Sequence, residues 1–416
     1  MKVIIVGAGP SGLLLALFLG KQGISVDILE KSSTLDTQPR ATHFSTPATY
    51  ELGRAGVLDD MDRGGFVPNS VCWRGLDGTR LGGLGIKTVF PEDYPHKMVC
   101  FPLDKLSPLL CEHITRVPSV RVHWSHNVVM LGQNDSSAWV EVETPEGSRK
   151  MSADYVVGCD GGRSIVRREL FGEDFPGFTW FEQIVATNTY YDFDQFGWED
   201  SNFIIHPEHY FMAARISPHR NKEALWRITY GEMPGLTRDE LLARQPDKFR
   251  TFLPGHPEPG SYNIVNFSPY KIHQRCAPKF RVGRVLLAAD AAHLCNPFGG
   301  LGLVGGITDV GGLADCLIGI HQGFANDSIL DHYDRVRREI YHRTINPASS
   351  ENFMRVCRQD ATHALKHDAF FVEIAKKAAT DRNFGLKLQA GLKDSLVHDF
   401  TQYYNTQNNG ETSMSA

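Results

Sequence analysis

The sequence predicts an α/β fold: a Rossmann-like domain that begins at the N-terminus, an antiparallel β-sheet domain inserted into it, and a helical C-terminal part. Three observations predict this fold. A buried-strand pattern at residues 2–6 is followed by a glycine-rich turn and an apolar helix. Two later apolar strands each end in an aspartate. An aromatic-rich region at 183–233 has strand-like alternation, which is typical of a sheet with one face toward a cavity.

The first thirty residues have the order of a dinucleotide-binding unit. KVIIV at 2–6 is continuously apolar, as expected of a buried parallel strand. GAGPSG at 7–12 then opens an apolar helix, and a second strand at 24–29 ends at Glu30. Strand, glycine turn, helix, strand and acid follow one another over about thirty residues, the size expected of such a unit. An ordinary βαβ turn is the plainer interpretation.

Each glycine of the turn has a physical role in such a unit. Gly7 allows the tight turn, Gly9 lets a pyrophosphate approach the backbone, and Gly12 lets the helix pack closely on the strand. The pyrophosphate is expected at the helix N-terminus, beside Pro10 and Ser11, because unpaired N–H groups and the helix dipole favour negative charge there.

The acid that closes the second strand constrains the dinucleotide. Glu30, followed by Lys31, can accept hydrogen bonds from a ribose and repels a 2′-phosphate. The site is therefore expected to hold FAD or NAD rather than NADP.

Two later stretches place an aspartate at the carboxyl end of an apolar strand. YVVGCDGGRSIVR at 155–167 contains Asp160, and GRVLLAADAAHLCNPFGGLG at 283–302 contains Asp290. Ligands of open α/β sheets bind at the carboxyl ends of the strands, so both side chains are candidates for cofactor contact. Each aspartate also has a plainer interpretation as a helix cap.

Taken together, the three stretches resemble those of the class A flavoprotein monooxygenases, the family of para-hydroxybenzoate hydroxylase, over about residues 1–345. The resemblance implies that the cofactor is FAD, with Glu30 on the adenosine ribose, Asp160 near the dinucleotide and Asp290 on ribityl or ribose hydroxyls. It also implies FAD contacts by Arg40, Pro297, Gly300, Leu301 and Gly302. Residues 273–302 and 333–353 look like a fungal secondary-metabolism subgroup of this family.

Two positions depart from the family pattern. Ala289 stands where the family has glycine, and we expect its methyl group to crowd the ribityl chain slightly. Leu103 stands where the family often has Gln or Arg and, unlike those residues, it cannot donate a hydrogen bond to FAD.

The reaction expected from the resemblance is a monooxygenation. NADPH or NADH, bound transiently, reduces the flavin; dioxygen adds at flavin C4a, and the hydroperoxide inserts one oxygen atom into an aromatic or other electron-rich molecule. Hydroxylation is favoured over epoxidation and decarboxylative hydroxylation. A non-hydroxylating reductase or dehydrogenase and a redox-sensing flavoprotein are the alternatives. Flavin-dependent halogenases carry a WxWxIP signature, which TWFEQI at 179–184 does not match.

The catalytic and substrate-binding candidates come mainly from the aromatic-rich region. A base near a substrate hydroxyl would help to form a phenolate, and the candidates are His206, Tyr210, Tyr230 and His43. Arg215 and Arg227 can hold a substrate carboxylate. Phe203, Met212 and Trp226 are candidates for the pocket wall. The plainer interpretation of each is a solvated or packed strand residue.

Composition limits the partners. A net charge of −5 and a pI of about 6.4 exclude the basic surplus that nucleic acid or an anionic membrane requires. Eight cysteines without a CxxC pair argue against a zinc site and favour a reducing, cytoplasmic location. The apolar run at 13–19 is too short to span a membrane, so no transmembrane segment is expected. The expected assemblies include a homodimer.

The expected domains follow from these assignments. The FAD-binding domain comprises residues 1–75, 100–178 and 270–345, the substrate domain 76–99 and 179–269, and the helical C-terminal part with a disordered tail 346–416. Helices are expected at 102–116, 236–252, 313–320 and 328–343.

Overall fold

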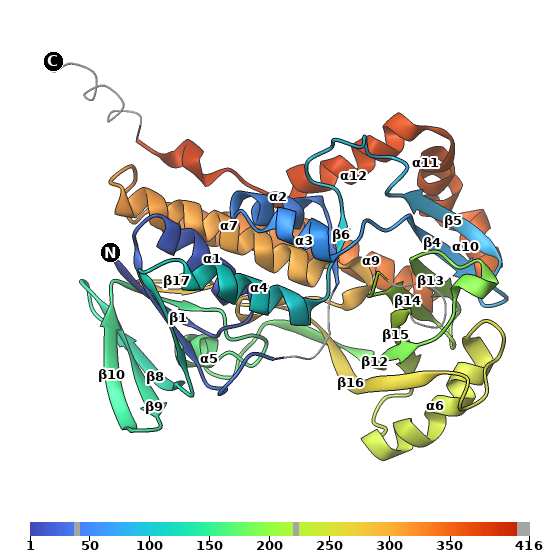
Figure 1. The fold of residues 1–416 in the computed structure, drawn as a ribbon, viewed down its shortest axis with the longest axis horizontal. Coiled ribbons are helices and arrows are strands. Elements are labelled where there is room, and N and C mark those ends of the chain that lie inside the picture. The colour runs from blue at the N-terminus through green and yellow to red at the C-terminus, as the bar shows by residue number, and fades with distance from the viewer. Residues whose placement is uncertain (37–41, 219–223, 406–416) are drawn as a thin grey trace.

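The computed structural model describes residues 1–36, 42–218 and 224–405. The protein has two halves, each built around one large β-sheet (Figure 1). A six-stranded sheet with the order β17-β18-β11-β1-β2-β7 forms one half. An eight-stranded sheet with the order β19-β16-β12-β15-β14-β13-β4-β5 forms the other. The predicted α/β fold with an inserted sheet and a helical C-terminal part is confirmed.

The six-stranded sheet brings the three sequence motifs to one edge. Its strands are β1 (Lys2–Val6), β2 (Ser25–Glu30), β7 (Val120–Trp124), β11 (Tyr155–Gly158), β17 (Arg281–Val282) and β18 (Val285–Leu287). All neighbouring pairs are parallel except β17 with β18. Val6 lies opposite both Leu29 and Gly158, and Gly158 lies opposite Leu287. The glycine turn, Glu30, Asp160 and Asp290 therefore all lie at the carboxyl ends of neighbouring strands, along one edge of this sheet.

Eight helical elements belong to this half of the described structure. They are α1 (Pro10–Lys21), α2 (Thr46–Arg54), α3 (Leu58–Gly64), α4 (Leu103–Thr115), α5 (Ile165–Phe171), α7 (Leu301–His321), α8 (Ile329–Ile340) and the turn η5 (Tyr341–Ile345). α1 packs against both α4 and α7 (Figure 1). The short strands β3 (His43–Phe44) and β6 (Val99–Cys100) pair with each other, and a side sheet is made of β8 (Asn127–Gln133), β9 (Ala138–Thr144) and β10 (Gly147–Ala153).

Helix α7 is longer than expected. The helix predicted at 313–320 begins at Leu301, because the glycine-rich run before Leu313 is helical and lets neighbours approach closely. A Cβ at Gly306 would lie 2.7 Å from Cβ of Ala289. By length and composition α7 could cross a membrane, but 83% of its most apolar window is buried inside the protein, as in a core helix.

The eight-stranded sheet has two differently covered faces. Its strands are β4 (Ser70–Gly75), β5 (Arg80–Gly85), β12 (Gly177–Tyr190), β13 (Ser201–Ile205), β14 (Phe211–Arg215), β15 (Leu225–Glu232), β16 (Asn263–Cys276) and β19 (His293–Leu294). On one face, here the α6 face, Ile204, Phe211 and Tyr230 pack with helix α6 (Arg238–Phe252). On the other, here the η4 face, Phe203 and Tyr210 pack with Phe298 of η4 (Pro297–Gly299).

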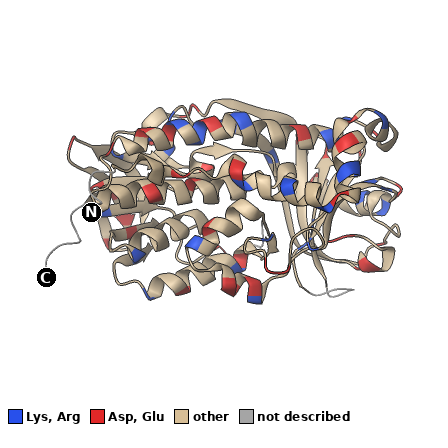
Figure 2. Cartoon of the chain, turned by 90° about the horizontal axis from the view of Figure 1, so that it is seen from above, with Lys and Arg blue, Asp and Glu red and all other residues tan. Residues whose placement is uncertain are grey.

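The C-terminal helices complete the η4 face. They are α9 (Asn346–Cys357), α10 (Ala361–His367), η6 (Phe370–Ala375), α11 (Lys376–Thr380), α12 (Arg382–Leu396) and η7 (Phe400–Tyr403). Phe353 of α9 and Phe371 of η6 belong to the same buried cluster as Phe298. Like η4 and η7, the elements η1 (Asp194–Phe196) and η3 (Ala289–Ala291) are short 3-10 turns. Charges of both signs are interspersed over the chain (Figure 2), in keeping with the small net charge of −5.

Candidate cofactor site and active site

The glycine turn has the geometry that a pyrophosphate requires. Gly7 has φ +103°, and a Cβ at Gly12 would overlap the carbonyl oxygen of Gly7, so packing demands glycine at both positions. A Cβ at Gly9 would meet no atom within 4 Å, so Gly9 borders open space. Helix α1 starts there without a capping side chain or an acidic residue in its first turn. An uncapped N-terminus beside open space suits a phosphate.

Glu30 fastens this turn. Its two carboxylate oxygens accept hydrogen bonds from the backbone N–H of Ala8 and of Ser32, each at 2.9 Å. A carboxylate oxygen can accept more than one hydrogen bond, so the predicted ribose contact stays compatible with this arrangement and stays a prediction. Lys31 is exposed next to it.

Asp160 caps a helix. Its carboxylate accepts hydrogen bonds from Ser164 Oγ at 2.5 Å and from the N–H of Ile165 at 2.6 Å, at the start of α5. Burial raises the pKa of this carboxyl group, and the hydrogen bonds oppose that rise. The plainer interpretation of Asp160 is thus realised, while its contact with the dinucleotide stays a prediction.

The departure at Ala289 acts through the backbone. Ala289 has φ +57°, a left-handed conformation that costs about 1–2 kcal/mol for a residue with a Cβ. Glycine, the residue that the resemblance implies at this position, would adopt this conformation without that cost. The methyl group of Ala289 lies toward Gly306 of α7, and the expected slight crowding of the ribityl chain stays a prediction. The next residue, Asp290, is exposed at the carboxyl end of β18.

A second helix N-terminus is also left without a capping side chain. Helix α7 follows Gly300, which has φ +64° and no atom within 4 Å of a Cβ position. A Cβ at Gly302 would meet only Cys295 Sγ, at 3.7 Å. The backbone of Pro297, Gly300, Leu301 and Gly302 can therefore come close to a flat ring, and together with the glycine turn it fits FAD. Leu103 is the first residue of α4 and packs on the core, and Arg40 lies outside the described residues.

His43 joins the two halves of the protein. One ring nitrogen is hydrogen-bonded to Thr42 Oγ1 at 2.7 Å, and the other to Ser201 Oγ of β13 at 2.8 Å. Burial lowers the pKa of His43 to about 4; Asp200 opposes and Arg215 reinforces this shift. The imidazole is therefore neutral at pH 7 and can accept a proton from one side while donating on the other.

The other predicted bases have different surroundings. Tyr210 lies on the η4 face, whereas Tyr230 lies on the α6 face against Phe249 and Phe252. Burial raises the pKa of both phenols, so both stay protonated at physiological pH and neither suits a base. His206 Nδ1 accepts hydrogen bonds from two backbone N–H groups of the turn that follows β13. The structure thus separates Tyr230 from the η4 face, where the flavin loop lies.

The predicted substrate-binding residues divide between the same faces. Phe203 and Met212 pack on the η4 face. Arg227 alternates with its α6-face neighbours Trp226 and Ile228, so it also takes the η4 face; its Nη1 donates to Asn188 Oδ1 at 3.1 Å. Trp226 is part of the α6 core, and its placement away from the flavin loop does not fit the predicted role in the pocket wall.

Arg215 is engaged in a buried ion pair. Its Nη2 lies 2.7 Å from Asp200 Oδ1, and the two side chains are 3% and 2% exposed. Its positive charge is therefore balanced within the protein by Asp200, so Arg215 attracts a substrate carboxylate less strongly than expected.

The sequence interpretation missed several residues of the η4 face. Trp73, Tyr270 and Phe353 belong to its cluster or pack on it, and Thr229 of β15 lies on the same face between Arg227 and Gly231. Strand alternation places Thr229 on the same face as Arg227. Only the positions of η4 and α9 show which of the two faces meets the flavin loop.

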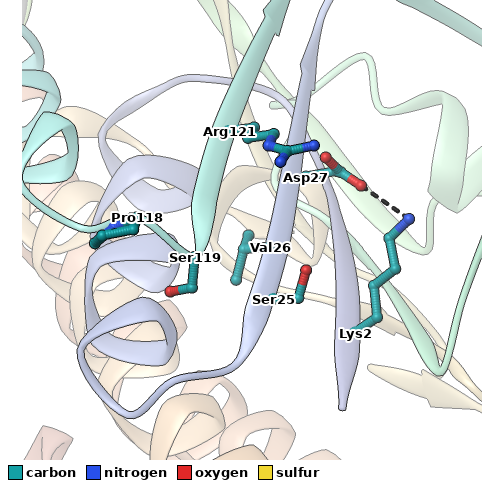
Figure 3. Close-up of a pocket in the computed structure, with 7 residues that line it drawn as sticks. All are labelled: Lys2, Ser25, Val26, Asp27, Pro118, Ser119 and Arg121. Atoms are coloured by element: carbon teal, nitrogen blue, oxygen red, sulfur yellow. Dashed lines mark ion pairs between the residues drawn. The ribbon is translucent and has the colours of Figure 1, made fainter.

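A separate pocket of about 190 Å³ lies at the opposite edge of the six-stranded sheet (Figure 3). It is lined at the amino ends of β1, β2 and β7, and Lys2 Nζ lies 3.0 Å from Asp27 Oδ2 there. Ligands of open α/β sheets bind at the carboxyl ends, so this pocket is not the cofactor crevice. Within residues 1–36, 42–218 and 224–405, no group of three or more His, Cys, Asp or Glu residues could hold a metal ion.

Comparisons with known proteins relate the chain to flavin-dependent monooxygenases. The chain is 35% identical over 388 residues to para-nitrophenol 4-monooxygenase of Pseudomonas sp. strain WBC-3, covering 93% of this chain and 95% of that protein. It is 35% identical over 359 residues to 6-hydroxy-3-succinoylpyridine 3-monooxygenase of Pseudomonas putida, covering 86% and 89%. The crystal structure of p-nitrophenol 4-monooxygenase from Pseudomonas putida DLL-E4 superposes with a TM-score of 0.88 at 34% identity, covering 95% of this chain and 98% of that one.

A family model described as FAD binding domain matches residues 1–348. The glycine turn, the strand-end aspartates and the flavin loop described above all lie within that range. The chain therefore belongs to the FAD binding domain family and is a flavin-dependent monooxygenase of the class A, para-hydroxybenzoate hydroxylase-like group.

Proposed function

We propose that this monooxygenase oxygenates a para-substituted phenol or hydroxypyridine at the ring carbon that carries the para substituent. The observation that carries the proposal is the shared ring position in the names of two relatives. Para-nitrophenol 4-monooxygenase acts at position 4, which bears the nitro group. In 6-hydroxy-3-succinoylpyridine 3-monooxygenase, position 3 bears the succinoyl group and lies para to the hydroxyl.

The FAD site supports the chemistry. Bound FAD supplies the activated oxygen that an electron-rich ring carbon accepts. The uncapped start of α1 beside Gly9 would hold the pyrophosphate, and the uncapped start of α7 beside Gly300 would face the flavin ring. Asp290, Glu30, Asp160 and Lys31 are proposed to contact the rest of the dinucleotide.

The η4 face supports an aromatic substrate. Phe203, Met212 and Trp73 supply an apolar wall, and Arg227 supplies a cation on the same face. The apolar wall keeps water away from the reacting carbon.

His43 is the proposed acceptor for the proton of the substrate hydroxyl. It is neutral, and it reaches the η4 face through Ser201 Oγ at 2.8 Å. A neutral imidazole can take a proton on one nitrogen and release one from the other to Thr42, and thereby help to form the electron-rich phenolate. Among the described residues, Tyr210, Tyr230 and His206 have no such pair of hydroxyl partners.

Several finer predictions are kept within the proposal. NADPH or NADH is the proposed reductant, bound transiently. A cytoplasmic location and a homodimer stay predictions. The fungal secondary-metabolism subgroup stays a prediction without support from the relatives named above, since those organisms are bacteria.

The test is oxygenation by the purified holoenzyme. NADH and NADPH oxidation in air is measured with p-nitrophenol, other 4-substituted phenols, unsubstituted phenol and 6-hydroxypyridines, with peroxide and products assayed in parallel. The proposal expects strong stimulation by the 4-substituted compounds, little peroxide, and loss of the para substituent. Hydroxylation only at unsubstituted carbons would contradict the regiochemistry, and stimulation without an oxygenated product would favour the reductase alternative.

A further inference from the structure

Gln274 connects the flavin loop, residues 295–302, with helix α9. It lies on β16 and is 2% exposed. Its Oε1 accepts a hydrogen bond from the backbone N–H of Asn296 at 2.6 Å. Its Nε2 donates to Asn346 Oδ1 at 2.7 Å and lies 3.1 Å from Ser349 Oγ. Both ends of one buried amide are thus in use, and they bind two different segments of the chain.

The direction of this amide is fixed by its partners. A backbone N–H can only donate, so the oxygen of Gln274 has to face Asn296 and its NH2 group has to face α9. A buried polar group that is left unpaired costs more than a hydrogen bond contributes. An apolar side chain of the same size therefore cannot replace Gln274 without loss.

Asn296 continues this connection along the loop. It is fully buried, and its Oδ1 accepts a hydrogen bond from the N–H of Phe298 at 3.0 Å, at the start of η4. The N–H of Gly300 donates to the carbonyl oxygen of Pro297 at 3.1 Å, directly before α7. These hydrogen bonds relate the position of Gln274 to that of the start of α7.

Helix α9 relates Gln274 to the pocket wall on the η4 face. Phe353 is one turn after Ser349, so it lies on the same side of the helix. The centroid of its ring is 5.0 Å from that of Phe298. A Cβ at Gly299 would lie 3.1 Å from Cα of Ser349, so the loop and the helix meet without a side chain between them. The spacing between wall and loop therefore depends on how Gln274 holds α9.

The two ends of the loop have other attachments. Before the loop, the carbonyl oxygen of Leu294 accepts a hydrogen bond from Tyr341 OH at 3.0 Å. Tyr341 begins η5, a π-helical turn of a kind that is rare and frequent at functional sites. After the loop, the chain continues into α7, where a Cβ at Gly305 would lie 2.7 Å from Cδ1 of Ile345. Gln274 acts on the stretch between these two points.

We propose that Gln274 is a positioning residue that sets the distance between the start of α7 and the pocket wall on α9. The inference rests on the proposed function, which places the flavin ring beside Gly300. A reduced flavin carries a negative charge, and the uncapped N-terminus of α7 stabilises it more than the neutral oxidised ring. A loop that moves away from the ring therefore lowers the reduction potential of the bound FAD.

The test measures the reduction potential of FAD in the holoenzyme without substrate, by equilibration with a redox dye of known potential. Gln274→Met keeps the size of the side chain and removes both of its hydrogen-bonding ends. It is expected to lower the affinity for reduced FAD, relative to oxidised FAD, about three- to fivefold. For a two-electron couple this change equals about 15–20 mV.

Gln274→Asn is the second variant. It keeps the amide, but it is one carbon too short to reach both the loop and α9. It is expected to lower the potential in the same direction, with a smaller loss of stability in urea than Gln274→Met. With a substrate that wild type oxygenates, both variants are expected to release at least about twice as large a share of peroxide, because a displaced wall admits water.

Gln245→Met is the matched control. Gln245 is 7% exposed and lies on α6, where its Nε2 is 3.3 Å from Tyr262 OH. The substitution makes the same chemical change at another buried glutamine, but on the α6 face. It is expected to change neither the reduction potential nor the share of peroxide.

The proposal is overturned if the folded Gln274 variants have the potential of wild type, or if Gln245→Met shifts it equally. Failure of both Gln274 variants to bind FAD, while Gln245→Met binds it, would give Gln274 a role in folding alone and would also overturn it. If wild type oxygenates no 4-substituted phenol, the proposed substrate fails. The potential is measured without substrate, so it still decides the role of Gln274.

Discussion

Arg337 and Asp309 form an ion pair of 2.6 Å in which both side chains are excluded from solvent. Asp309 also meets His293 Nε2 at 2.7 Å and accepts from the backbone N–H of Ala289 at 3.0 Å. Burial alone would raise the pKa of Asp309, but His293 and Arg337 hold it below its usual value. Arg337 also donates to the carbonyl oxygen of Leu396, so this carboxylate connects the strained Ala289, next to Asp290, with the C-terminal helices.

Arg337→Met is expected to lower the free energy of unfolding by about 3–5 kcal/mol, because it leaves the buried Asp309 carboxylate without its guanidinium partner, held only by His293 and the backbone N–H of Ala289. Urea unfolding measures the change. Arg335→Met is the control: its ion pair with Glu339 is 3.7 Å long and exposed, so its loss should cost less than about 1 kcal/mol. Equal effects of the two variants would contradict the assigned role of the buried pair.

Gly9→Ala and Gly12→Ala are expected to fail in different ways. A methyl group at Gly9 enters open space, so stability should change by less than about 1 kcal/mol, while FAD affinity falls at least about tenfold because the pyrophosphate loses its approach. A methyl group at Gly12 overlaps the backbone of Gly7 and should destabilise the apoprotein by about 3 kcal/mol.

Flavin fluorescence titration and urea unfolding of the apoproteins separate the two effects. Gly391→Ala is the control, because a Cβ at Gly391 of α12 would meet no atom within 4 Å. It should leave FAD binding unchanged and should not lower the free energy of unfolding. Normal FAD affinity in Gly9→Ala would contradict the placement of the pyrophosphate.

How much of this site the sequence predicts depends on strand order. The motifs around Gly7, Asp160 and Asp290 are each local, and each predicts a strand followed by a turn. Register then aligns Val6 with Gly158 and Gly158 with Leu287, which is why three separated motifs meet. On β15, by contrast, alternation separates Tyr230 from Thr229 but does not say which face meets the cofactor. That depends on η4 and α9, whose residues are more than sixty positions away.

Glu51→Gln is expected to stabilise the protein at alkaline pH. Glu51 is 1% exposed, and burial together with Asp315 raises its pKa from 4.5 to about 7, although Arg54 opposes the rise. A raised acid pKa means that the folded state binds the proton more tightly, so stability falls as pH rises from 4.5 to about 7. The cost is absent below pH 4.5, fully present above pH 7, and at most about 3 kcal/mol.

The measurement is the difference in unfolding free energy between Glu51→Gln and wild type at pH 5 and pH 8. The stabilisation should grow from pH 5 to pH 8. A difference that does not depend on pH would show that Glu51 is ionised across this range in the folded protein.

His43→Gln is expected to have the opposite pH dependence. Burial lowers the pKa of His43 from 6.5 to about 4, so the unfolded chain binds the proton more tightly and stability falls as pH drops from 6.5 through 4. Glutamine does not titrate, so the variant should gain stability relative to wild type by at most about 3 kcal/mol as pH falls through that window, and nothing above pH 6.5.

The side-chain amide of the introduced glutamine can still form hydrogen bonds with the hydroxyls of Thr42 and Ser201, which keeps the two halves connected. It cannot relay a proton, so oxygenation of a 4-substituted phenol should slow most where the free phenol is un-ionised and recover as pH rises above the phenol's own pKa. Unfolding free energies at pH 5 and 7.5, together with the pH profile of kcat, measure both effects. A uniform loss of activity at every pH would make His43 a structural link alone.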